Sequence, residues 1–171
     1  PSPAIDQTTR DKIGNIASMA VAKMGYLGLG TIEFLYEDGQ FFFIEMNTRL
    51  QVEHPITEAI TGIDLVKEQI MIAAGQPISF KQNDVKFNGH AIECRINAED
   101  PKTFIPSPGK ITQFHSPCGL GIRIESCVYS GYVVPPYYDS LIAKLIVHAS
   151  DREQCILRLK QALKEIVIEP I

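Results

Sequence analysis

Acidic, amide and basic side chains alternate through a short stretch that directly follows an apolar run ending at Ile44. In chain order they are Glu45, Asn47, Arg49, Gln51 and Glu53. A strand that runs out into a polar loop holds such groups on a rigid scaffold and can aim them into a cleft. Carboxylates bind hard metal ions, an arginine binds planar oxyanions, and a carboxylate beside such an anion can remove its proton. The stretch therefore indicates an enzyme or part of one.

A second carboxylate, Glu33, precedes this stretch on the other side of Gly39, and the spacing predicts a β-hairpin. With a loop of three or five residues, Glu33 and Glu45 face each other with Cβ atoms about 4.5–5.5 Å apart. A two-residue turn at Asp38 and Gly39 would put them on opposite faces. Two carboxylates that close need a cation or a proton between them. With the amide oxygen of Asn47 they suit Mg²⁺, which leaves positions for substrate phosphates; the alternative is two solvated carboxylates.

The residues that follow could bind and deprotonate an anion. In extended backbone Arg49, Gln51 and Glu53 share one face. Arg49 offers a fork for a carboxylate or bicarbonate, and Glu53 could act as a general base beside it. An Arg49–Glu53 ion pair that holds the loop is the alternative. Arg95, in the middle of a predicted strand, needs a ligand or a partner, and an ion pair with a nearby acid is the alternative there.

Apolar periodicity and turn residues divide the chain into two parts. The first part has predicted helices over residues 6–23 and 64–74 and strands over 28–36 and 40–46. A polar segment near residues 80–88 separates it from a β-rich part with predicted strands over 91–96, 110–114, 121–126 and 141–148. A last helix follows Ser150 and Asp151, which can cap it. The predicted class is α+β.

Composition excludes several classes of protein. The 171 residues are 45% hydrophobic and carry a net charge of −4, which argues against nucleic-acid and anionic-membrane partners. No apolar run approaches the roughly 20 residues of a membrane span, and the first residues do not form a signal peptide. The four cysteines lack metal-ligand spacing and indicate reduced thiols in the cytoplasm.

Four longer stretches resemble the biotin carboxylases of the bacterial acetyl-CoA carboxylase type, which are ATP-grasp ligases. They span residues 43–55, 93–101, 106–110 and 135–140. The resemblance implies ATP-dependent carboxylation of biotin through carboxyphosphate, the first step of malonyl-CoA and fatty acid synthesis. It also implies a biotin carboxyl carrier protein and carboxyltransferase subunits as partners, a homodimer, and a cytoplasmic location.

By this resemblance, the hairpin binds the nucleotide and its metal. Glu33 and Glu45 would hold Mg²⁺, or Mn²⁺, under the phosphates of ATP, with Asn47 as a further metal ligand. Leu35 would form part of the wall beside the adenine.

The remaining matched residues would act on bicarbonate and biotin. Arg49 would pair with bicarbonate, helped by Gln51 and the backbone N–H of Val52. Glu53 would deprotonate bicarbonate, and Arg95 would stabilise the enolate of biotin.

The resemblance also implies a domain organisation. Residues 1–82 would form the second half of an ATP-grasp domain, and residues 83–171 an incomplete biotin carboxylase C-terminal domain. The family's glycine-rich lid, its ATP-binding lysines and its N-terminal domain would precede Pro1, so this chain alone is expected to be inactive.

Two other functions remain open from the sequence. The first is the same half-reaction within a pyruvate or propionyl-CoA type of carboxylase. The second is a non-catalytic module in which the β-rich part only makes dimer contacts.

Overall fold

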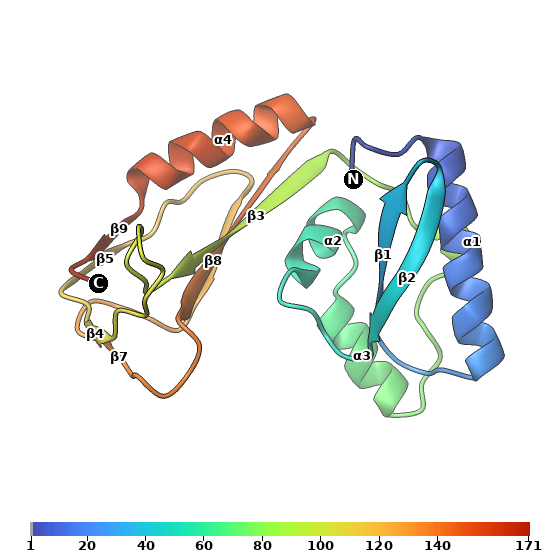
Figure 1. The fold of residues 1–171 in the computed structure, drawn as a ribbon, viewed down its shortest axis with the longest axis horizontal. Coiled ribbons are helices and arrows are strands. Elements are labelled where there is room, and N and C mark those ends of the chain that lie inside the picture. Colours follow the sequence, from blue (N-terminus) through green and yellow to red (C-terminus); the bar gives the residue numbers. More distant parts are fainter. Residues whose placement is uncertain (1) are drawn as a thin grey trace. The chain divides into compact units, whose positions relative to one another are not determined.

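The computed structural model describes residues 2–171 and contains both α-helices and antiparallel sheets, so the predicted α+β class is confirmed (Figure 1). It forms two compact units. One comprises the residues up to His54 together with Gly62–Lys86, and the other comprises Pro55–Thr61 with Phe87–Ile171. The boundary placed after residue 82 stays a prediction. Within residues 2–171, every helix is too short or too polar to cross a membrane.

The first unit begins with helix α1, Gln7–Met24, close to the predicted range. The carboxylate of Asp6 accepts a hydrogen bond from the backbone N–H of Thr9 at 2.8 Å and so caps the helix. Gly25 ends it in the left-handed conformation, with φ of 66°. Both ends of α1 are therefore set by residues that can be recognised in the sequence.

A β-hairpin follows, formed by β1 (Thr31–Glu37) and β2 (Gln40–Asn47). The strands are joined by Asp38 and Gly39 alone, with φ of 48° and 77°. Positive φ at both positions matches the mirror-image two-residue turns that suit the twist of a hairpin. An uninterrupted ladder from such a turn would place Glu33 and Glu45 on opposite faces.

A β-bulge in β2 changes this outcome. Phe34 pairs with Phe43, whereas the next residue, Glu33, pairs with Glu45, so Ile44 is an extra residue. The extra residue moves everything beyond it to the other face of the strand. Glu33 and Glu45 are therefore cross-strand partners on one face despite the short turn.

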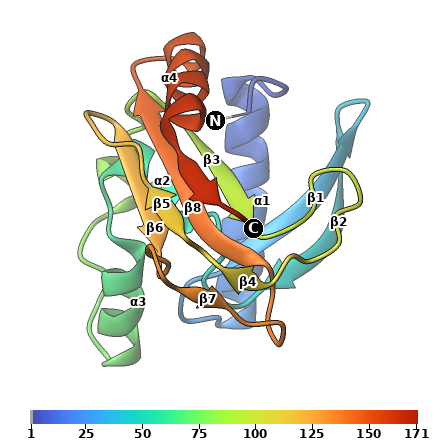
Figure 2. The same ribbon diagram turned by 90° about the vertical axis from the view of Figure 1, so that its left-hand side faces the viewer.

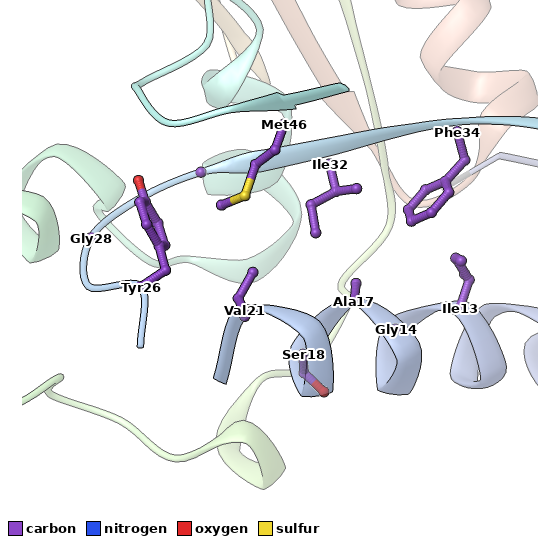
Figure 3. Close-up of a pocket in the computed structure, with 11 residues that line it drawn as sticks. Ile13, Gly14, Ala17, Ser18, Val21, Tyr26, Gly28, Ile32, Phe34 and Met46 are labelled. Carbon is purple, nitrogen blue, oxygen red and sulfur yellow. The ribbon is translucent and has the colours of Figure 1, made fainter. Parts of the chain in front are cut away.

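The apolar residues of the hairpin explain why the bulge is favourable. One face carries Ile32, Phe34 and Met46, and these side chains point toward α1 across an open pocket of about 400 Å³ (Figure 3). The Phe34 ring also contacts the ring of Phe43, with centroids 6.3 Å apart. In an uninterrupted ladder Glu45 would pair with Ile32 on this apolar face, where a carboxylate loses hydration. The bulge keeps the apolar side chains on one face and the carboxylates on the other.

Two short helices follow the hairpin. Helix α2, His54–Thr61, was not predicted, because its second residue is a proline that the first turn of a helix nevertheless tolerates. Helix α3, Leu65–Ala73, matches the prediction, and Asp64 caps it by accepting the N–H of Lys67 at 2.8 Å. A 3₁₀ turn, Gln82–Asp84, precedes the change to the second unit.

The second unit contains an antiparallel sheet in the order β3-β8-β6 (Figure 2). These strands span His90–Asn97 (β3), Leu141–Ala149 (β8) and Ile122–Ser126 (β6). Two smaller pairs are β4 (Gly109–Lys110) with β7 (Val133–Val134), and β5 (Gln113–His115) with β9 (Val167–Glu169). The strand predicted over residues 110–114 is thus two short strands, and β7 and β9 were not predicted.

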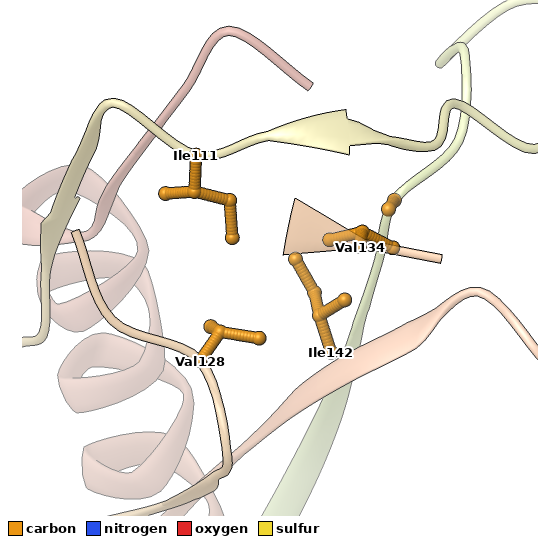
Figure 4. Close-up of a cluster of buried hydrophobic side chains, with 5 residues drawn as sticks. Ile111, Val128, Val134 and Ile142 are labelled. Atoms are coloured by element: carbon orange, nitrogen blue, oxygen red, sulfur yellow. The ribbon is translucent and has the colours of Figure 1, made fainter. Parts of the chain in front are cut away.

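Helix α4, Arg152–Glu165, packs against β8 and β3, and Asp151 caps it as predicted. Together they bury one apolar cluster that includes Leu145, Val147, Cys155 and Ala162. A second cluster lies where the smaller strand pairs meet β8 (Figure 4). It consists of Ala98, Ile111, Val128, Val134 and Ile142. All four cysteines are free thiols.

Leu145→Ala is expected to lower the free energy of unfolding by about 2–5 kcal/mol, because Leu145 is 0% exposed and its removal leaves a cavity. Denaturant unfolding measures this change. Leu157→Ala is the matched control, since Leu157 on α4 is 55% exposed and should cost less than about 1 kcal/mol. Equal costs for the two substitutions would contradict the assignment of the core.

Candidate functional site

Three of the predicted site residues meet on one face of the hairpin. The Nδ2 atom of Asn47 lies 2.9 Å from Oε1 of Glu33 and 2.9 Å from Oε1 of Glu45. The amide thus donates hydrogen bonds to both carboxylates and offsets part of their mutual repulsion. All three residues come from β1 and β2, beyond the bulge at Ile44.

The chemistry of this acid–amide cluster, defined as Glu33, Glu45 and Asn47, fits Mg²⁺. Two carboxylates and one amide converge on one point, and a half-turn of the Asn47 amide presents its oxygen there instead of its nitrogen. Such a set supplies only oxygen ligands and leaves coordination positions for phosphate and water. No cluster of three or more histidine, cysteine, aspartate and glutamate side chains that could hold a metal occurs within residues 2–171. The fit therefore rests on two carboxylates and an amide.

Leu35 extends the same face of the hairpin with an apolar surface. It pairs with Phe42 across the ladder, and the two residues are 62% and 49% exposed. Because alternate residues of a strand share a face, Leu35 lies beside Glu33 on the side of the acid–amide cluster. The polar acid–amide cluster and the apolar surface of Leu35 are thus adjacent on one face of the hairpin.

Beyond Asn47 the strand ends in a loop, so Arg49, Gln51 and Glu53 do not have the extended backbone that would place them on one face. The carbonyl oxygen of Gln51 accepts the backbone N–H of His54 at 3.3 Å, which closes a turn. The Nδ1 atom of His54 lies 2.8 Å from the same oxygen, and since a carbonyl only accepts, Nδ1 is the donor. His54 therefore has a structural contact here. Arg49 lies in a bend and Glu53 in the turn, and both are exposed.

Gln51 has an unusual side-chain environment. Its Nε2 atom is buried and has no hydrogen-bond partner among the described residues. A buried amide N–H without an acceptor costs free energy, so an anionic or carbonyl oxygen placed there would be stabilised. The guanidinium of Arg49 donates to the carbonyl of Leu50 at 3.2 Å. This segment therefore offers donors suited to an oxyanion.

Arg95 belongs to the second unit, in the middle of β3 as predicted. Its side chain is 52% exposed, and Nε lies 4.0 Å from Oε1 of Glu93. The ion pair considered from the sequence is thus present, but half of the arginine surface remains open to solvent.

Comparison with known proteins identifies the family. Residues 1–81 match the family model of the carbamoyl-phosphate synthase L chain ATP-binding domain. Residues 93–171 match the model of the biotin carboxylase C-terminal domain. The biotin carboxylase of Haemophilus influenzae is 62% identical over all 171 residues. The chain belongs to the biotin carboxylase family. It spans 38% of the length of that curated relative.

Other biotin carboxylase family members are similar over nearly the whole chain. One of the pyruvate carboxylase subunits of Methanothermobacter thermautotrophicus is 55% identical over 98% of the chain, which covers 34% of that relative. A crystal structure of the biotin carboxylase domain dimer of Hydrogenobacter thermophilus 2-oxoglutarate carboxylase, in complex with MgADP, ADP and bicarbonate, has a TM-score of 0.96 at 50% identity. The match covers 99% of this chain and 38% of that one. The resemblance inferred from the sequence motifs is confirmed.

Proposed function

We propose that this chain supplies the residues that bind the metal, bicarbonate and biotin in an ATP-dependent biotin carboxylase. The observation that carries the proposal is the convergence of Glu33, Glu45 and Asn47 on one face of the hairpin. The reaction transfers the γ-phosphoryl group of ATP to bicarbonate, which forms carboxyphosphate and releases ADP. It then transfers the carboxyl group of carboxyphosphate to N1 of biotin and releases phosphate. Membership of the biotin carboxylase family supports this reaction.

In the proposed first step the hairpin holds ATP. Glu33, Glu45 and Asn47 bind Mg²⁺, and Mn²⁺ would suit the same oxygen ligands. The ion, when bound, neutralises charge that develops on the phosphates. The exposed side chain of Leu35 supplies an apolar surface for the adenine. The MgADP in the structure of the Hydrogenobacter relative supports this assignment.

The segment after β2 would bind and activate bicarbonate. The planar fork of Arg49 matches a planar oxyanion, and the buried Nε2 of Gln51 and the N–H of Val52 would donate to its oxygens. Glu53 would take the proton from bicarbonate, which makes the anion a better nucleophile. The bicarbonate in the structure of the Hydrogenobacter relative supports this part of the proposal.

In the second step Arg95 would stabilise negative charge on the ureido oxygen of biotin while N1 attacks. An exposed guanidinium on a rigid strand is suited to this oxyanion-type role, because it needs little rearrangement when charge develops.

We further propose the setting that the family implies. The acceptor is biotin on a biotin carboxyl carrier protein, and carboxyltransferase subunits use the product for malonyl-CoA and fatty acid synthesis. The protein acts in the cytoplasm as a homodimer, which the dimeric domain of the Hydrogenobacter relative supports.

The proposal predicts that the complete carboxylase containing this chain transfers label from bicarbonate to free biotin, and that transfer requires ATP and Mg²⁺. The 171-residue chain alone is expected to transfer none. Labelled bicarbonate and chromatographic separation of carboxybiotin measure the reaction. Absence of transfer by the complete protein would contradict the proposed function, and ATP-dependent transfer by the chain alone would show that it holds a phosphate site of its own.

A second setting is favoured by one observation. The 55% identity to a relative from a pyruvate carboxylase allows the same half-reaction to serve pyruvate instead of acetyl-CoA. Reconstitution with each type of carboxyltransferase, followed by measurement of malonyl-CoA and oxaloacetate, separates the two settings.

A further inference from the structure

The sheet of the second unit has a charged face opposite α4. The cross-strand register places its residues in two rows that run from β3 through β8 to β6. One row is Glu93, Ile146 and Arg123, and the other is Arg95, Lys144 and Glu125. Neighbouring positions in such rows interact directly, so the surroundings of Arg95 are defined by this register.

Glu93 is buried although it is charged. Only 4% of its side chain is exposed, compared with 52% for Arg95 two residues later on the same face. Its cross-strand neighbour Ile146 is 2% exposed, so an apolar side chain fits the same layer. Removing a carboxylate from water costs free energy that an apolar residue at this position would avoid. Packing alone therefore does not account for a glutamate at position 93.

Glu93 contacts Arg95 at the inner end of the guanidinium group. The Oε1 atom of Glu93 lies 4.0 Å from Nε, the nitrogen attached to the aliphatic stem of Arg95. This distance is longer than a hydrogen bond, so the attraction is electrostatic, and it favours one direction of the stem while half of the side chain stays exposed to solvent. The Glu93 carboxylate is thus placed to orient the Arg95 side chain from the buried side of the sheet face.

Lys144 is the competing cation on this face. It lies directly across from Arg95, where two positive charges repel each other, and 14% of its side chain is exposed. Its Nζ atom lies 2.5 Å from Oε2 of Glu125. The other oxygen of Glu125, Oε1, accepts a hydrogen bond from Arg123. The Lys144 ammonium is thereby held toward Glu125, on the β6 side of the row.

The anchor for Lys144 is itself supported. Burial alone would raise the pKa of Glu125, but hydrogen bonds from Lys144 and Arg123 outweigh it and hold the pKa below its usual value. Arg123 also binds Glu58 of α2 at 2.9 Å. Glu125 therefore remains ionised at neutral pH and retains Lys144.

We infer that Glu93 is a positioning residue for the carboxylation of biotin. Its buried carboxylate orients Arg95 through the ion pair at Nε, while Glu125 binds Lys144 and keeps the ammonium group away from Arg95. The inference rests on the proposed function, in which Arg95 stabilises negative charge on biotin. Glu93 acts through Arg95 and does not touch the substrate.

The test is a mutant cycle in the complete carboxylase containing this chain. Glu93→Gln is expected to lower kcat for carboxylation of free biotin by about 10- to 100-fold, the range that misplacement of a catalytic group produces. On an Arg95→Ala background the same substitution is expected to change the rate less than about 2-fold, because no guanidinium remains to orient. Glu153→Gln, at an exposed position on α4, is the matched control and should keep the wild-type rate.

Glu93→Asp provides a variant that keeps the charge if Glu93→Gln does not fold. It is expected to lower kcat by about 3- to 10-fold in the presence of Arg95 and not in its absence. Wild-type rates for the Glu93 variants, or a loss that persists on the Arg95→Ala background, would overturn the inference alone. A wild-type carboxylase that carboxylates no biotin would overturn the proposed function and the inference with it.

Discussion

Glu45→Gln in the complete carboxylase is expected to lower kcat/KM for ATP by about 100-fold or more, because it removes one of the two charges proposed to bind the metal. Glu33→Gln should have a similar effect, since Glu33 and Glu45 are cross-strand partners that share the amide of Asn47. Both substitutions should also raise the Mg²⁺ concentration needed for half-maximal activity. Initial rates measured over a range of Mg²⁺ concentrations check this expectation.

Glu37→Gln is the matched control for the acid–amide cluster. Glu37 lies on β1, on the same face as Glu33 but four residues away, which is about 13 Å along a strand. Its substitution should leave the Mg²⁺ dependence within about 2-fold of the wild type. If Glu37→Gln and Glu45→Gln shifted the Mg²⁺ dependence equally, the effect would come from the net charge of the hairpin and not from metal ligands.

Arg49→Lys is expected to lower kcat/KM for bicarbonate by about 100-fold, although the positive charge is kept. A lysine ammonium cannot make the two parallel hydrogen bonds that an arginine fork makes to a planar oxyanion. The buried Nε2 of Gln51 would remain as a donor, so some binding of bicarbonate should persist. The measurement is the initial rate over a range of bicarbonate concentrations, with ATP and biotin saturating.

Two comparisons isolate the role of Arg49. Arg152→Lys, at an exposed position at the start of α4, makes the same chemical change away from the site and should have no effect. The KM for ATP in Arg49→Lys should stay within about 2-fold of the wild type, because the acid–amide cluster is intact. An equal rise in the KM values for ATP and bicarbonate would mean that Arg49 supports the fold of the hairpin and not one substrate.

The sequence predicted those features that depend on neighbouring residues. The start of α4 was predicted because Asp151 is a recognisable cap. The two strands of the hairpin were predicted because their apolar residues and the Asp38–Gly39 turn form a short-range signal. For these elements, the identities of residues close together in the sequence were enough to predict the structure.

Register and cross-strand contacts required the structure. The bulge at Ile44 decides whether Glu33 and Glu45 meet, and nothing in the local sequence distinguishes it from an uninterrupted strand. The turn closed by Gln51 and His54 follows the strand, so alternation in the sequence does not show where Arg49 and Glu53 lie relative to each other. Lys144 was not connected with Arg95 because their pairing depends on two strands that are distant in the sequence.

The extra residue at Ile44 also makes the acid pair insensitive to how the tip of the hairpin is arranged. A ladder with a three-residue loop over 38–40 and no bulge would pair Phe41 with Glu37, and it would still pair Glu33 with Glu45. The pairing of the two carboxylates is therefore common to both alignments, and only the pairs between Phe34 and the turn distinguish them. An alignment with the three-residue loop therefore keeps Glu33 and Glu45 side by side, and a change between the two alignments alters only the pairs between Phe34 and the turn.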